Sequence, residues 1–97
     1  MNAVTETIIS QLGGNRFQAM TGTKQFMQIE NGVQANFGKS NQGINSVLIT
    51  LNDNDTYDLK FWRLTSRSMK EIVGVGDIHA SELQGVFTNI TGLDTSL

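Results

Sequence analysis

The architecture is encoded most clearly in residues 46–62, which read SVLITLNDNDTYDLKFW. Apolar residues alternate with polar ones on both sides of a polar centre, and the two apolar triplets are Val47, Ile49, Leu51 and Tyr57, Leu59, Phe61. This period of two predicts two strands, each with one buried face. Both triplets face one core only if Leu51 pairs with Tyr57, Ile49 with Leu59 and Val47 with Phe61. That register requires a three-residue loop, Asp53-Asn54-Asp55, whose residue types tolerate left-handed backbone.

A helix is predicted at each end of the chain. Val4, Ile8, Ile9 and Leu12 recur at helical spacing before Gly13-Gly14, which predicts a helix over about residues 3–12. Leu83, Val86, Phe87 and Ile90 give a second amphipathic pattern that ends at Gly92. Asp77 is the preferred side-chain cap of this closing helix, because His79 with Glu82 is not a strict capping box.

The remaining segments give weaker patterns. Residues 25–37 read as a hairpin around Asn31-Gly32, a type I′ turn signal. A two-residue turn there would pair Gln28 with Ala35, but neither face is purely apolar, so the register stays open. Met69–Val75 is a further predicted strand after a turn at 65–68. Residues 15–24 show no clean period, and Phe17 and Met20 are expected to anchor them to the core.

These elements predict a single α+β domain over residues 1–97. Its N-terminal helix is followed by an antiparallel sheet of four to five strands in a meander, and then by the C-terminal helix. Both helices are expected to pack on one face of the sheet.

Composition excludes several classes of protein. The 97 residues contain no cysteine, so no disulfide framework and no thiolate metal site can form. A net charge of -2 and a pI near 5.1 disfavour both a DNA mimic and nonspecific nucleic-acid binding. No apolar run approaches the roughly 20 residues of a membrane helix. The N-terminus lacks the pattern of a secretory signal, so a cytoplasmic location is expected.

No group of residues points to catalysis, a metal or a cofactor. His79 is the single histidine and is expected to be a surface residue at a helix start. Residues 53–58 begin like a calcium loop, but Asp58 and Leu64 stand where that motif requires glycine and glutamate. The Gly74-Val75-Gly76 run lacks the lysine and the strand–helix context of a phosphate loop. The sequence therefore predicts a protein that is not an enzyme.

A candidate binding surface follows from the outer face of the second strand. If Leu59 and Phe61 point inward, then Lys60 and Trp62 point outward, and Trp is enriched at binding hot spots. The proposed register places Leu48 beside Lys60. The candidate binding residues are Trp62, Lys60, Leu48, Arg63, Arg67 and Lys70, the last three because they lie near in sequence. In the alternative, a helix covers this face and Trp62 belongs to the core.

Three blocks of sequence carry a family resemblance. They are LGGNRF with AMTGTKQF (12–17, 19–26), GIN with ITL and DTYD (43–45, 49–51, 55–58), and LQGVF with TGLDTSL (83–87, 91–97). Together they resemble a group of small uncharacterised proteins encoded by bacteriophages and related mobile elements. The resemblance implies a phage or mobile-element origin, and it implies no catalytic residue.

Three functions are consistent with these observations. The first is a binding protein, such as a modulator or inhibitor of a host or defence protein. The second is a nucleic-acid-binding module, whose helix–strands–helix order loosely resembles a double-stranded-RNA-binding domain. The third is a small enzyme using His79, Tyr57 or the carboxylates, which no spacing supports. An edge strand such as Met69–Val75 could also pair across a homodimer.

Overall fold

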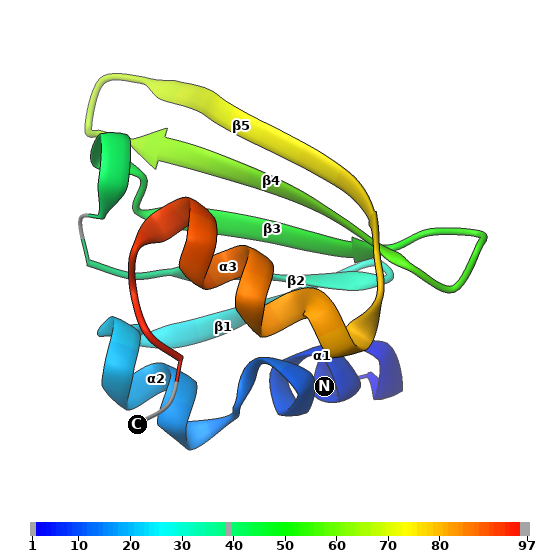
Figure 1. Cartoon of the computed structure of the whole chain (residues 1–97). Coiled ribbons are helices and arrows are strands. Elements are labelled where there is room, and N and C mark those ends of the chain that lie inside the picture. The colour runs from blue at the N-terminus through cyan, green and yellow to red at the C-terminus, as the bar shows by residue number, and fades with distance from the viewer. Residues whose placement is uncertain (1, 39, 96–97) are drawn as a thin grey trace.

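The computed structural model describes residues 2–38 and 40–95. The elements, in chain order, are α1 (Ala3–Leu12), α2 (Asn15–Thr21), β1 (Gln25–Ile29), β2 (Gly32–Asn36), the 3-10 turn η1 (Asn41–Gly43), β3 (Ser46–Leu51), β4 (Tyr57–Leu64), β5 (Met69–Ile78), the 3-10 turn η2 (Ala80–Glu82) and α3 (Leu83–Thr91). The strands form one antiparallel sheet in the order β1-β2-β3-β4-β5. The three helices lie on the same side of this sheet (Figure 1), so the predicted α+β meander with its helices on one face is confirmed.

The β3–β4 hairpin has the predicted register. Leu51 pairs with Tyr57, Ile49 with Leu59 and Val47 with Phe61. The loop is closed by a hydrogen bond of 2.9 Å from the Asn52 amide to the Thr56 carbonyl oxygen. Asp55 adopts the left-handed conformation with φ of 60°. Loop length, turn residues and apolar alternation thus agree on one geometry.

The terminal helices begin and end close to the predicted residues. The side chain of Asn2 accepts a hydrogen bond of 2.8 Å from the Thr5 amide, which caps α1, and Gly13 follows the last residue of the helix. Gly92 ends α3 in the left-handed conformation with φ of 77°. Both helices turn their apolar stripes toward the sheet.

Residues 15–24 contain a helix that the sequence pattern does not predict. In α2 only Phe17 and Thr21 are buried, one turn apart, so the seven residues show no repeated apolar period. Gly14 and Gly22 flank the helix. A helix this short is unstable in isolation, and docking of Phe17 in the core stabilises it.

The β1–β2 turn lies one residue earlier than the Asn-Gly motif suggests. Ile29 pairs with Gly32, so Glu30 and Asn31 form the turn, and Asn31 has φ of 55°. A Cβ atom on Gly32 would lie 2.1 Å from the carbonyl oxygen of Ile49 on β3. Glycine is therefore required here by the close approach of the neighbouring strand. Phe26 pairs with Ala35, two residues from the partner that an Asn-Gly turn would give it, so the faces of the strands are unchanged.

The end of β5 differs from the prediction in its length and in the role of Asp77. The strand continues beyond Val75 to Ile78. The Asp77 carboxylate accepts hydrogen bonds from Thr56 Oγ1 at 3.2 Å and Asn52 Nδ2 at 3.4 Å. The Asp77 side chain therefore binds the β3–β4 loop rather than the start of the closing helix. The prediction that Asp77 caps that helix is wrong. The carboxylate of Glu82 instead accepts from the His79 amide at 3.3 Å, at the start of η2.

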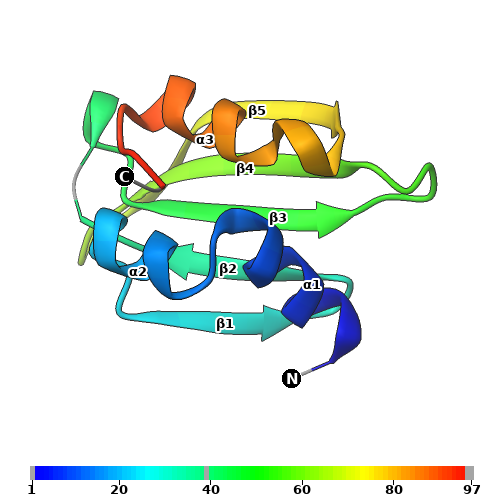
Figure 2. The ribbon, with the colours of Figure 1, turned by 60° about the horizontal axis from the view of Figure 1, so that its bottom comes forward.

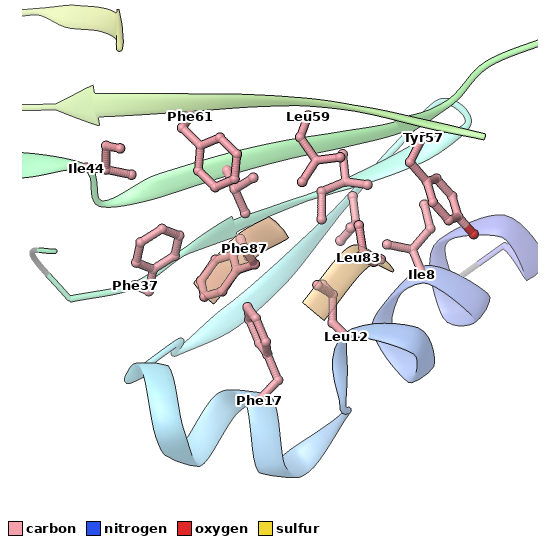
Figure 3. Packing of buried hydrophobic residues seen from close by; sticks show 14 residues of the cluster. Ile8, Leu12, Phe17, Phe37, Ile44, Tyr57, Leu59, Phe61, Leu83 and Phe87 are labelled. Atoms are coloured by element: carbon pink, nitrogen blue, oxygen red, sulfur yellow. The ribbon is translucent and has the colours of Figure 1, made fainter. Parts of the chain in front are cut away.

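The core lies between the helices and the sheet (Figure 3). Phe87 of α3 stands at its centre, with ring centroids 4.9 Å from Phe17 and 5.3 Å from Phe37 in edge-on geometry. The side chains of Phe61 and Leu59 point from β4 toward the helices (Figure 3). The centre of the inner face of the sheet is thereby buried against the helices.

Candidate binding surface

The face of the sheet turned away from the helices is uncovered by any described element, and we call it the open face (Figure 2). Successive residues of a strand point to opposite faces, and the buried apolar residues of β2, β3 and β4 point to the helices. The residues between them therefore lie on the open face. Its members are Met27, Ile29, Gly32, Gln34, Asn36, Ser46, Leu48, Thr50, Asp58, Lys60, Trp62, Leu64, Met69, Glu71, Gly74 and Gly76.

Trp62 lies on the open face and is partly exposed. The three helices pack on the opposite face, so the alternative in which a helix covers Trp62 is wrong. Trp62 pairs with Ser46 on one side and with Glu71 on the other. Ser46 is 0% exposed although no helix lies above it, so its neighbours on this face cover it. The indole therefore belongs to a packed layer of side chains on the outside of the sheet.

Beside Trp62, three polar side chains form a hydrogen-bonded cluster. Ser46 Oγ donates to Asn36 Oδ1 at 2.7 Å, and Gln34 Nε2 donates to Ser46 Oγ at 3.3 Å and to Asn36 Oδ1 at 3.4 Å. These contacts fix the side chains before any partner arrives. Fixed side chains lose less conformational entropy on binding, which favours association.

Apolar side chains flank this cluster. Leu48 lies at the centre of the sheet between Gln34 and Lys60, and Met27 and Ile29 lie on β1. All three apolar residues are partly exposed. An apolar surface interrupted by amides is typical of a protein-binding patch.

The predicted basic residues do not all gather around Trp62. Lys60 is exposed on the open face, two residues from Trp62 along β4. Arg63 pairs with Lys70 at the end of the sheet. Strand alternation places this pair on the helix side, where the Arg63 side chain lies against Gly43 of η1. Arg67 lies in the turn between β4 and β5. Of the cations proposed from sequence, only Lys60 shares a face with Trp62.

Two glycines create a shallow hollow that sequence reasoning missed. Gly74, Val75 and Gly76 of β5 line it together with Asp58 and Lys60. A Cβ atom on Gly74 would meet no atom closer than 3.6 Å, so the fold itself does not require glycine there. Glycine inside a strand is unfavourable by roughly 0.5–1 kcal/mol relative to alanine and often marks the close approach of another group. The signal in the sequence is a pair of glycines inside a strand and away from a turn.

Tyr57 and His79, which the sequence offers as candidate catalytic groups, lie apart from the open face. The Tyr57 hydroxyl donates to Gln11 Oε1 of α1 at 2.6 Å, and burial raises the pKa of its phenol above the ordinary value. His79 is exposed. Within residues 2–38 and 40–95, no three His, Asp or Glu side chains are grouped so that they could hold a metal ion. In the same residues, no helix has the length and apolar character needed to cross a membrane.

No family model matches the chain, and neither the curated proteins nor the solved structures contain a match to it.

Proposed function

We propose that this chain is a small non-catalytic binding protein whose open face docks on a protein partner. The observation that supports this most directly is a sheet with one face packed and the other free, with a partly exposed Trp62 on the free side. Apolar Leu48 and the ordered amides of Gln34 and Asn36 extend the same surface. Tryptophan set in a partly apolar, ordered surface is the residue type that most often dominates binding energy at interfaces.

The partner class follows from the sequence resemblance. A phage or mobile-element protein acts inside the host cell, so we propose a cytoplasmic host or defence protein as the target. A modulator of this kind needs a shaped surface and no catalytic group. The small size of the chain and its single candidate surface are consistent with that role.

A nucleic-acid partner is less favoured by the arrangement of charge. Lys60 is flanked on the open face by Asp58 on its own strand and Glu71 on β5, while Arg63 and Lys70 lie on the other side of the sheet. Phosphate backbones bind to clustered cations, and the affinity then falls steeply with salt. The open face lacks such a cluster among the residues that the structure describes.

Affinity capture from host lysate, followed by measurement of Kd with the purified partner, tests the proposal. Trp62→Ala should weaken partner binding at least tenfold, because loss of an interface tryptophan costs about 2 kcal/mol or more. Arg63→Ala is the matched control, since it changes the next residue of β4 on the opposite face. It should change Kd less than twofold.

Two results would contradict the proposal. One is a partner whose affinity is unchanged by Trp62→Ala. The other is capture of RNA or DNA that is lost with increasing salt and with Arg67→Ala or Lys70→Ala, which would identify a nucleic-acid-binding protein. Thermal unfolding of each variant by circular dichroism separates lost binding from lost folding.

A further inference from the structure

The Asn31-Gly32 dipeptide at the turn between β1 and β2 carries a reactive group that the proposed binding surface does not use. We infer that it is a site of spontaneous deamidation, which the native fold holds in an unreactive geometry and which opening of the turn makes reactive. Asn31 is exposed, so water reaches its side chain, whereas Gly32 is buried. This inference goes beyond the proposed function and does not rest on it.

The reaction needs only the chain itself and water. The Gly32 nitrogen attacks Asn31 Cγ, so a bond forms between these two atoms and the bond from Cγ to Nδ2 breaks. The Nδ2 group takes up the proton of the Gly32 amide and leaves as ammonia, and a five-membered succinimide ring remains. Water then opens the ring at one of its two carbonyl carbons. Opening at Cγ gives aspartate, and opening at the main-chain carbonyl carbon of Asn31 gives isoaspartate.

The residue after Asn31 makes it the most reactive asparagine of the chain. Asparagine is one of the thermolabile residue types, and a side chain on the residue that follows it hinders ring closure. Glycine has no side chain and leaves the attacking nitrogen accessible. Asn31 is the single asparagine of the sequence that precedes a glycine.

The conformation of Asn31 opposes ring closure in the folded protein. Asn31 has φ of 55°, in the left-handed region, where ψ is typically about +47°. At such a ψ the Gly32 nitrogen lies nearly opposite Cβ across the bond from Cα to the carbonyl carbon. Ring closure requires the nitrogen and Cβ to lie on the same side of that bond. The main chain must therefore rotate by well over a right angle before it can react.

Contacts with two other elements oppose this rotation. The Asn31 carbonyl oxygen, which the rotation would swing away, accepts a hydrogen bond of 2.8 Å from the Leu51 amide of β3. The Gly32 carbonyl oxygen accepts a buried hydrogen bond of 2.7 Å from Thr5 Oγ1 of α1. Gly32 also lies so close to β3 that a Cβ atom on it would be 2.1 Å from the carbonyl oxygen of Ile49. The native turn is thus held closed by α1 and β3 together.

Isoaspartate at position 31 is incompatible with the same contacts. Its main chain runs through Cγ and is one methylene longer between residues 31 and 32, and the former main-chain carbonyl becomes a charged carboxylate. The added length displaces Gly32 from β3 and breaks the hydrogen bonds to Leu51 and Thr5. A molecule that stays open long enough to react therefore does not regain the same native state. The turn in this way limits the lifetime of the folded protein.

Incubation of the full chain at mildly alkaline pH, with and without urea, tests the inference. Mass spectrometry of the peptide that contains Asn31 measures the fraction converted to aspartate and isoaspartate. The native protein should react at least about tenfold more slowly than the chain unfolded in urea, because the reaction waits for the turn to open. Asn36 precedes phenylalanine and is the internal reference, which should stay largely unmodified in both samples.

A substitution on α1 tests whether the described contacts keep the turn closed. Thr5→Val removes the hydroxyl that binds Gly32, and in native buffer it should raise the rate at Asn31 about threefold to tenfold, the effect of losing one buried hydrogen bond. Thr7→Val is the matched control, since Thr7 is exposed on the same helix and its hydroxyl donates to the Ala3 carbonyl oxygen at 2.8 Å. This control should react like the natural sequence. In urea all three chains should react at one rate.

The effect on the fold is measured on the isolated isoaspartate product. Its unfolding in urea is compared with that of Asn31→Asp, which has the same charge and a main chain of ordinary length. The isoaspartate product should unfold at a lower urea concentration. Asn31→Asp should unfold close to the natural sequence, because aspartate also tolerates the left-handed conformation.

Three results would overturn the inference. They are equal rates at Asn31 in native buffer and in urea, a folded Thr5→Val chain that reacts like the natural sequence, and an isoaspartate product as stable as Asn31→Asp. Circular dichroism establishes that each variant is folded before its rate is measured. None of these measurements involves a partner, so they and the Trp62 binding test succeed or fail independently.

Discussion

Tyr57 illustrates how one residue joins the sheet to the helices. It is the first of the inward-facing apolar residues of β4. Its hydroxyl donates a hydrogen bond of 2.6 Å to Gln11 Oε1 on α1. Burial raises the pKa of the phenol, an effect that the Gln11 side chain only partly offsets. The protonated phenol is thus favoured in the folded state over the unfolded state.

The stability of the protein should therefore fall in alkaline solution. The contribution of Tyr57 is fully present below the ordinary pKa of 10.0 and is lost as pH rises through the higher pKa of the folded state. Urea unfolding at increasing pH should show this loss of stability. Tyr57→Phe, which has no phenol to ionise, should remove the contribution of Tyr57 to the pH dependence. Tyr57 is the single tyrosine, so ultraviolet difference absorption measures its titration directly. Titration of the folded protein at or below the ordinary value would contradict this account.

At the scale of elements, the β3–β4 hairpin depends on one asparagine side chain. Asn52 Oδ1 accepts hydrogen bonds from the Asn54 amide at 2.9 Å and from Thr56 Oγ1 at 3.0 Å. Its Nδ2 donates to Asp58 Oδ1 at 3.1 Å. The loop residues are thus tied both to each other and to the start of β4.

Asn52→Ala should lower the free energy of unfolding by about 1–2 kcal/mol, because several partners lose their hydrogen bonds together. Asp53→Ala is the control in the same loop, where the residue is exposed, and it should change stability by no more than about 0.5 kcal/mol. Chemical denaturation measures both values. Equal effects of the two substitutions would show that the Asn52 network does not hold the loop.

The elements that the sequence predicts are those whose signals are local. The β3–β4 hairpin and the terminal helices combine a repeated apolar period with a loop or glycine that stops it. The short α2 has no such period, because only Phe17 and Thr21 are buried. The β1–β2 register was not predictable either, because it places Gly32 in close approach to Ile49 of β3, a strand outside the hairpin. Local patterns do not report contacts with distant strands.

The same distinction applies to the candidate site. Alternation along β4 correctly places Lys60 and Trp62 outward, and the β3 register adds Leu48. Proximity in sequence was a poor guide for Arg63, because neighbouring residues of a strand point to opposite faces. The sequence did not reveal the hollow at Gly74, because the hollow is formed jointly by residues of β4 and β5 that are far apart in the chain.

At the scale of the whole molecule, the distribution of helices explains the open face. Figure 2 shows α1 and α2 on the side of β1 and β2, with α3 next to them on the same face of the sheet. These helices bury the centre of the inner face, including Phe61 at 0% exposure. The other face retains a tryptophan, further apolar side chains such as Leu48, and the hydrogen-bonded cluster of Gln34, Asn36 and Ser46. This asymmetry is the basis of the proposed binding function.

The most direct test compares two adjacent residues of β4 that lie on opposite faces, Phe61 and Trp62. The free energies of unfolding of Phe61→Ala and Trp62→Ala are measured by chemical denaturation. Phe61→Ala should cost about 3–5 kcal/mol, as expected for a buried ring, and Trp62→Ala less than about half of that. If Trp62→Ala costs as much as Phe61→Ala, Trp62 is a core residue and the open face is not a binding surface.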